Sequence, residues 1–184
     1  MVAVVAWQVW PSSGEPDVAV PARVCDGALS GADVKALLPE KGERFSQWHS
    51  GVFNPEQPYA RKAAGTCKVY GGGKAVRIEH SLYSKGDCTM EDVARDAGAA
   101  GAIRITLGEA DGFHEGDTTS LFADCSSEQG KAVVEVDVTY EKTSDRAVIR
   151  KTASLAADTL RLEARELWDC QGADSLPNGV PRLG

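Results

Sequence analysis

The sequence lacks the motifs that mark the common classes of enzyme and of nucleic-acid-binding protein. It contains no CxxC pair, so its five scattered cysteines do not predict a zinc site, whose ligands usually come in close pairs. It contains no GxSxG motif, and "GGGKA" at 71–75 has alanine where a phosphate-binding loop needs serine or threonine. Its net charge is −7 and its basic residues are thinly spread, unlike proteins that bind phosphate backbones. We therefore expect no nucleic-acid partner and no cofactor.

A long hydrophobic run is also missing, although residues 1–10 are nearly all apolar. A bilayer span needs about 20 such residues, and no Lys or Arg precedes Arg23 to form the basic head of a secretory signal. Two alternatives remain: a strand that joins a sheet edge, or the outer half of a membrane anchor that begins further upstream. The tryptophans at the end of the run and the acidic flank that follows favour the anchor. Proline-rich residues then predict an extended spacer up to residue 24.

Beyond the spacer, the hydrophobic pattern is typical of one globular domain. Helices are expected from Ser30 and Thr89, which have cap-forming side chains, and over 144–168, where apolar residues form a stripe at helical spacing. Alternating residues such as 103–107 predict strands. We expect an α+β fold, in which an antiparallel sheet has its helices packed on one face. The expected boundaries are the anchor stump and spacer at 1–24, the domain at 25–172 and a flexible tail at 173–184.

The domain contains a weak internal duplication. Without a gap, "CKVYGGGKAVRIEHSLY" at 67–83 lies over "CSSEQGKAVVEVDVTYE" at 125–141. In this alignment the apolar faces coincide, with Val76 over Val134 and Ile78 over Val136. Each unit then reads as a cysteine-bearing strand, a turn, a second strand and a helix.

This repeated unit predicts how the cysteines pair outside the cytoplasm. A strand cysteine would be tied to a cysteine at the end of a helix that packs on it, which joins Cys125 to Cys170. By the same pattern Cys25 joins Cys67, and each bridge closes a loop of roughly 45 residues, worth about 4 kcal/mol in the chain-entropy model. Cys88 remains as a free thiol. It precedes a helix start, where a thiol can be reactive, but an inert unpaired cysteine is the simpler interpretation.

A segment of the chain resembles uncharacterised membrane-anchored and secreted envelope proteins of actinobacteria. The resemblance lies in "VCDGALSGADVKALLP" at 24–39, followed by "GTCKVY" at 65–70: a cysteine, a capped helix, and a second cysteine beside an aromatic residue on a strand. It implies an extracytoplasmic, non-enzymatic domain with no catalytic residues. The chain departs from the lipoproteins of this group because valine, rather than a small residue, directly precedes Cys25. The mode of anchoring therefore stays open.

Two sets of residues offer chemistry, and each has a simpler explanation. The stretch "GEADGFHEGD" at 108–117 gathers acidic residues and His114, which suit a hard cation or a polar exposed loop equally; its spacing is not that of a calcium loop. Cys88 with His80 or His114 is the most specific enzyme hypothesis. A thiol- or metal-assisted hydrolase that uses Cys88 or the Glu109–Asp117 loop is therefore the alternative function, and no metal site is predicted.

The function that the sequence favours is binding. A long connection, "SGVFNPEQPYARK" at 50–62, follows Trp48 and contains Phe53, Tyr59 and Arg61, residue types that are enriched at interaction hot spots. These rings form either a recognition surface or a cap on the core. We expect a non-enzymatic interaction module of the cell envelope, tethered to the membrane, whose partner is a protein or a small envelope ligand.

Overall fold

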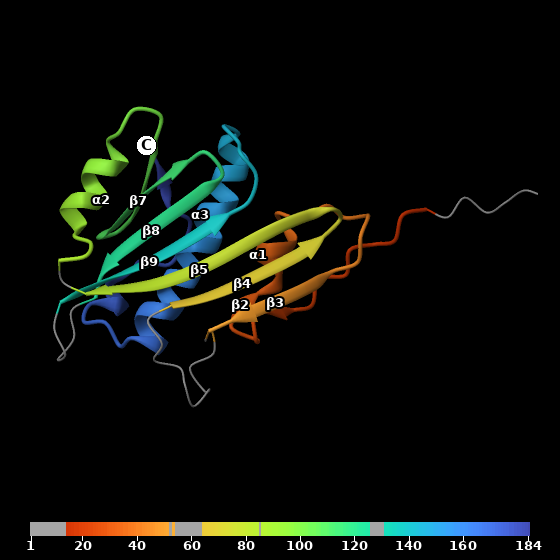
Figure 1. Cartoon of the computed structure of the whole chain (residues 1–184), viewed down its shortest axis with the longest axis horizontal. Coiled ribbons are helices and arrows are strands. Elements are labelled where there is room, and N and C mark those ends of the chain that lie inside the picture. Colours follow the sequence, from red (N-terminus) through yellow and green to blue (C-terminus); the bar gives the residue numbers. More distant parts are fainter. Residues whose placement is uncertain (1–13, 52, 54–63, 85, 126–130) are drawn as a thin grey trace, which may run out of the picture.

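The computed structural model describes residues 14–51, 53, 64–84, 86–125 and 131–184 (Figure 1). The expected anchor stump at 1–10 lies outside the described residues. Within the described part of the chain, no helix has the length and hydropathy needed to cross a membrane.

One large antiparallel sheet organises the fold. Its strands lie in the order β10-β6-β7-β8-β9-β5-β4-β3, and a separate small sheet pairs β1 with β2. The confirmed fold class is thus α+β with an antiparallel sheet. The strands are β1 (Arg23–Val24), β2 (Leu29–Ser30), β3 (Ser46–Ser50), β4 (Ala64–Gly71), β5 (Lys74–Ser84), β6 (Ile103–Leu107), β7 (Ala110–Glu115), β8 (Thr118–Asp124), β9 (Ala132–Thr139) and β10 (Arg182–Leu183).

The strand register separates the two faces of the sheet. Cys67 on β4 lies opposite Ile78 on β5, which lies opposite Val138 on β9, and all three are fully buried. Since side chains alternate along a strand, the neighbours of these residues point to the other face. The β4–β5 turn is made by Gly72 and Gly73 at φ +59° and +76°, the left-handed backbone that a two-residue hairpin requires.

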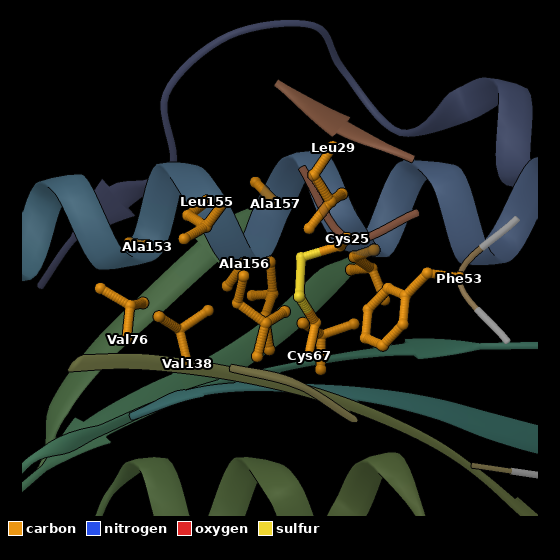
Figure 2. Close-up of a cluster of buried hydrophobic side chains, with 14 of the residues drawn as sticks. Cys25, Leu29, Phe53, Cys67, Val76, Val138, Ala153, Leu155, Ala156 and Ala157 are labelled. Atoms are coloured by element: carbon orange, nitrogen blue, oxygen red, sulfur yellow. A yellow bond between two sulfur atoms is a disulfide. The ribbon is translucent and has the colours of Figure 1, made fainter. Parts of the chain in front are cut away.

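Two helices lie on the face that carries Cys67, which we call the α3 face. Helix α3 (Arg146–Leu162) packs on β8 and β9, continues as the π-helical turn η1 (Glu163–Leu167), and contacts the short α1 (Gly31–Lys35). Figure 2 shows side chains of α3, such as Leu155 and Ala156, between the helix and the sheet. Asp145 caps α3 by accepting a hydrogen bond from Ala147 N, and Ser30 caps α1 similarly.

The third helix lies on the opposite side, which we call the α2 face. Helix α2 (Met90–Ala97) begins with the expected capping box, in which Thr89 and Asp92 exchange hydrogen bonds. It packs on β7 and β8 through a separate small core of Val93, Phe122 and Val133. Figure 2 shows this green helix across the sheet from α3. The expectation that all helices share one face is therefore wrong for α2, because β8 and β9 carry apolar residues on both faces.

The two copies of the sequence repeat are only partly alike. Both give hairpins, and their second strands, β5 and β9, pair with each other. Cys67, however, lies inside β4, whereas Cys125 follows the end of β8. The helices after the two hairpins also lie on opposite faces, so the duplicated unit does not include a common helix position.

The expected extended spacer and the expected flexible tail are both packed on the domain in their described parts. In the spacer, Val18 is buried and its N–H donates to Glu40 O. The backbone of Asp17 forms an isolated antiparallel β-bridge with that of Lys41. At the other end, η2 (Ala173–Ser175) and β10 replace the predicted tail. Strand β10 pairs with β6, and Arg161 donates to carbonyls of Pro177 and Gly179. The tail prediction is wrong because buried Leu176 and these arginine contacts hold the segment.

Candidate functional site

The structure contains two disulfides, and they join the same cysteines as the sequence pattern. Cys25 and Cys67 have their Cα atoms 5.6 Å apart, and those of Cys125 and Cys170 are 4.6 Å apart. The first bridge ties the turn after β1 to the middle of β4, the strand next to the sheet edge (Figure 2). The second ties the end of β8 to the residues after η1. Structural disulfides of this kind are typical of proteins in oxidising compartments outside the cytoplasm.

Cys88 is the free cysteine among the described residues, and its surroundings oppose reactivity. Burial raises the pKa of its thiol, and the nearby carboxylates of Glu135, Asp92 and Asp96 raise it further. A higher pKa leaves less thiolate at neutral pH, which is the opposite of an activated nucleophile. The helix start that suggested a reactive thiol is outweighed by these acidic neighbours.

The proposed partners of Cys88 lie across the sheet from it. Cys88 packs in the small core of the α2 face. His114 lies on the α3 face, where its ring nitrogens contact Thr119 Oγ1 at 2.9 Å and the Thr143 carbonyl at 3.2 Å. His80 also lies on the α3 face, in register with Val136. The sheet therefore separates the thiol from both imidazoles, and the nucleophile-pair hypothesis is wrong.

The acidic stretch at 108–117 is strand β7 and its flanking turns, not a loop. Alternation sends Asp111 to the α2 face, where Arg104 Nε donates to it at 3.0 Å, and sends His114 to the α3 face. The carboxylates and the imidazole thus diverge. Among the described residues, no group of three or more His, Cys, Asp or Glu side chains is arranged to hold a metal ion.

The aromatic residues singled out from the sequence have different fates. Trp48 on β3 is 53% exposed, whereas Phe53 is fully buried with its ring edge-on to His80 at 4.9 Å. Phe53 therefore belongs to the core and is wrong as a surface recognition residue. Tyr59 and Arg61 lie outside the described residues.

Trp48 belongs to a row of side chains that crosses the α2 face at the far end from α2. Trp48 lies opposite Lys68 on β4, which lies opposite Arg77 on β5. The Lys68 ammonium lies 5.8 Å from the centre of the Trp48 ring, within cation–π range. Tyr70, two residues from Lys68, is 40% exposed. We call Trp48, Lys68, Tyr70 and Arg77 the tryptophan row. It combines exposed rings and cations on a rigid sheet.

Carboxylates occupy the same face between the tryptophan row and α2. Burial raises the pKa values of Glu135 and Asp137, whose charged forms are poorly solvated there. Tyr83 donates to Glu135 at 2.7 Å, and this bond with burial raises the Tyr83 pKa to about 12. The α2 face therefore changes from basic and aromatic at β3 and β4 to acidic at β9.

A small cavity of about 280 Å³ lies at the other end of the α3 face. Cys170 of the second disulfide, Ala164 of η1 and residues of η2 line it, with Glu109 and Asp124 on its wall. Glu109 comes from the turn between β6 and β7, and Asp124 comes from the end of β8.

Sequence reasoning did not find the most unusual polar contact in the core. His80 Nδ1 and Glu163 Oε2 are 3.0 Å apart, and both side chains are 0% exposed. Strand alternation predicts that His80 shares a face with Val76 and Ile78, and the mixed charges of the last long helix predict that Glu163 is on the surface. Glu163 continues the apolar stripe of α3, seven residues after Ala156 and three after Leu160, so ordinary helical periodicity turns its side chain inward, and the π-helical turn begins at this residue.

Comparison of the chain with family models, with curated proteins and with solved structures gives no match. The functional assignment therefore rests on the chemistry of the residues described above.

Proposed function

We propose that this chain is a non-enzymatic binding module that acts outside the cytoplasm, at the cell envelope. The single observation that carries the proposal is the tryptophan row, with an indole 53% exposed and a lysine cation beside it. Exposed Trp, Tyr and Arg side chains dominate binding energies at interfaces. An indole that is more than half exposed buries little apolar area in its own fold, and a partner that covers it would account for its surface position.

The chemistry available elsewhere supports binding rather than catalysis. Catalysis needs a nucleophile or base held by a second group and placed where substrate can reach it. In the described part of the chain, Cys88 has a raised pKa and His80 and His114 are almost wholly buried in structural contacts. The thiol-hydrolase alternative therefore has no supporting observation.

The location outside the cytoplasm is supported by the two disulfides. The resemblance of residues 24–70 to anchored actinobacterial envelope proteins adds the envelope and a membrane tether to this proposal. The tether would precede the described residues.

The proposal is tested by comparing partner capture from envelope extracts by the wild-type protein and by single-residue variants. We expect Trp48→Ala and Lys68→Ala to reduce capture at least tenfold while the melting temperature stays within about 2 °C, as exposed positions contribute little to folding. Val180→Ala is the matched control, because Val180 is a similarly exposed apolar side chain, at 57%, away from the row.

Two results would overturn the proposal. Equal capture by Trp48→Ala, Lys68→Ala and Val180→Ala would remove the tryptophan row as the site. A turnover activity that is lost in Cys88→Ser or His114→Ala, with the melting temperature unchanged, would make the protein an enzyme.

A further inference from the structure

The buried contact between His80 and Glu163 connects the centre of the sheet to the end of the long helix. His80 is on β5, and Glu163 is the first residue of η1. Their side chains are wholly buried, with Nδ1 and Oε2 3.0 Å apart. A charged group without a partner is very costly in such a place, and ionisable residues are rarely buried without a partner.

The contact has few electrostatic neighbours among the described residues. On the adjacent strands His80 lies opposite Gly65 of β4 and Val136 of β9, neither of which is charged. The Phe53 ring covers its edge. The Trp168 side chain lies near the Glu163 carboxyl.

The charged groups on the surrounding elements are engaged elsewhere. Arg161 of α3 binds Asp158 and the carbonyls of Pro177 and Gly179, and Arg165 of η1 donates to Ala173 O and Leu176 O. Glu166 of η1 is exposed to solvent. On β5 and β9, Glu79, Arg77, Glu135 and Asp137 point to the α2 face, and His114 of β7 is bonded to Thr119 and Thr143. Within the described residues, the charged groups of these elements are thus bonded elsewhere or directed to solvent or the other face.

One proton satisfies this pair. A neutral carboxyl can donate to the imidazole nitrogen, or an imidazolium can donate to the carboxylate, and both arrangements are neutral overall. Burial raises the pKa of Glu163 to about 9, an effect that Trp168 partly opposes. Loss of the proton leaves a buried carboxylate whose charge is poorly solvated, which favours any movement that brings Glu163 to water.

The η1 turn is suited to such a movement. Its π-helical hydrogen bond joins Trp168 N–H to the Glu163 carbonyl at 3.0 Å, and one-turn π segments are uncommon and often found where function requires them. The turn is followed by Asp169, which has φ +49°, a left-handed backbone that ends the helix at this point.

We propose that His80 and Glu163 form a proton-held clamp: while the pair carries a proton it fixes η1 against β5, and release of the turn is coupled to loss of that proton. The clamp makes the seating of η1 and Trp168 sensitive to the pH outside the cell. It acts independently of the tryptophan row, which lies on the other face of the sheet.

The clamp is tested on the full chain by hydrogen exchange of the amides of 163–170, corrected for the intrinsic effect of pH on exchange. A carboxyl with a pKa near 4.5 when exposed and about 9 when buried makes opening easier by up to about tenfold per pH unit between these values. We expect local protection to fall at least tenfold from pH 6 to pH 8 in the wild type and less than threefold in Glu163→Gln.

A control variant and an NMR titration distinguish the clamp from a general loss of stability. His114→Gln alters the other buried histidine of the α3 face and should retain the wild-type pH slope. Because Glu163→Gln is a core change that can impair folding, the carboxyl carbon of Glu163 is also titrated by NMR in the wild-type protein, with a midpoint above pH 7 expected. A midpoint below pH 6, or the same exchange slope in the wild type and Glu163→Gln, overturns the clamp.

Discussion

The two faces of the sheet differ in how much of their surface other elements cover. The α3 face is covered by α3, α1 and the small β1–β2 sheet, and its residues form one continuous apolar core fixed by a disulfide. On the α2 face the described chain places one eight-residue helix over β7 and β8, with a core of only a few residues. The remainder of that face carries rings and charges.

The α3 face therefore supplies most of the folding stability, and the α2 face offers the surface that we propose binds a partner. Buried apolar area is the main source of folding stability, and most of it lies on the α3 face. Side chains on the α2 face are therefore free to vary without unfolding the protein. The exception is the His80–Glu163 contact, a polar element placed within the stabilising face.

Among these tests, the largest loss of stability is expected when a buried aromatic ring is removed from the α3 face. Phe53→Ala should destabilise the protein by about 4 kcal/mol, because it removes a fully buried ring and leaves a cavity beside His80. Urea denaturation measures the change. A loss below about 1 kcal/mol would show that Phe53 is not part of the core.

Removal of a disulfide should have an effect of similar size. The bridges span 42 and 45 residues, so Cys25→Ser with Cys67→Ser and Cys125→Ser with Cys170→Ser should each lose about 4 kcal/mol in the chain-entropy model. Denaturation of the two double variants under identical conditions gives the comparison. Cys88→Ser is the control and should stay close to wild type; a large loss in that variant would mean that Cys88 is essential to the α2 face.

The pH dependence of stability should follow the Glu163 carboxyl. Its folded pKa is raised to about 9 from an ordinary value of 4.5, so the folded state holds one more proton than the unfolded state between these values. Stability is then greatest below about pH 4.5 for this group and falls as pH rises toward 9, by about 1 kcal/mol per pH unit. Glu163→Gln should flatten this slope between pH 6 and 8. Parallel slopes for the two proteins in chemical denaturation would contradict the assignment.

The cap of α2 should have a smaller effect. Thr89→Ala removes the side chain that accepts from Asp92 N and breaks the capping box, at a cost of about 1 kcal/mol. Exchange of the α2 amides should increase while that of α3 stays constant. If both helices lose protection equally, the two faces unfold as one unit.

The smallest stability effect is expected in the tryptophan row. Trp48→Ala should change the free energy of unfolding by less than about 0.5 kcal/mol, because the side chain is mostly exposed at an edge strand. Calorimetry of the variant measures it. A loss as large as that of Phe53→Ala would make Trp48 a structural residue and remove the distinction between the faces.

The sequence predicts much of the α3 face because the helices and strands there follow the regular spacing of apolar residues that is typical of each element. The cap at Ser30, the long helix after Asp145, the strand at 103–107 and the two disulfide pairs all follow from local pattern and spacing. Alternation also places Val76, Ile78 and His80 on one buried face, as the structure does.

The remaining features depend on contacts that local pattern does not record. Phe122 and Val133 lie on the face of β8 and β9 that is opposite to α3. Helix α2 packs on these two side chains and so forms a second, separate core. Glu163 lies on the buried stripe of the long helix, but its charge is typical of a surface residue, and only its contact with His80 explains its place in the core. The final residues read as a tail because their anchors, Arg161 and Arg146, are far away in the sequence.

The order of the cysteines along the chain has a consequence for how the protein matures. Each bridge joins neighbouring thiols in the sequence, Cys25 to Cys67 and Cys125 to Cys170, with Cys88 between the pairs. In a chain oxidised as it emerges from its N-terminal end, the first pair is complete before Cys88 appears. Cys125, in contrast, emerges while Cys88 is still free and Cys170 is absent. The route to a mispaired, trapped product therefore runs through Cys88 and Cys125, and the second half of the chain is where maturation needs thiol exchange to correct it.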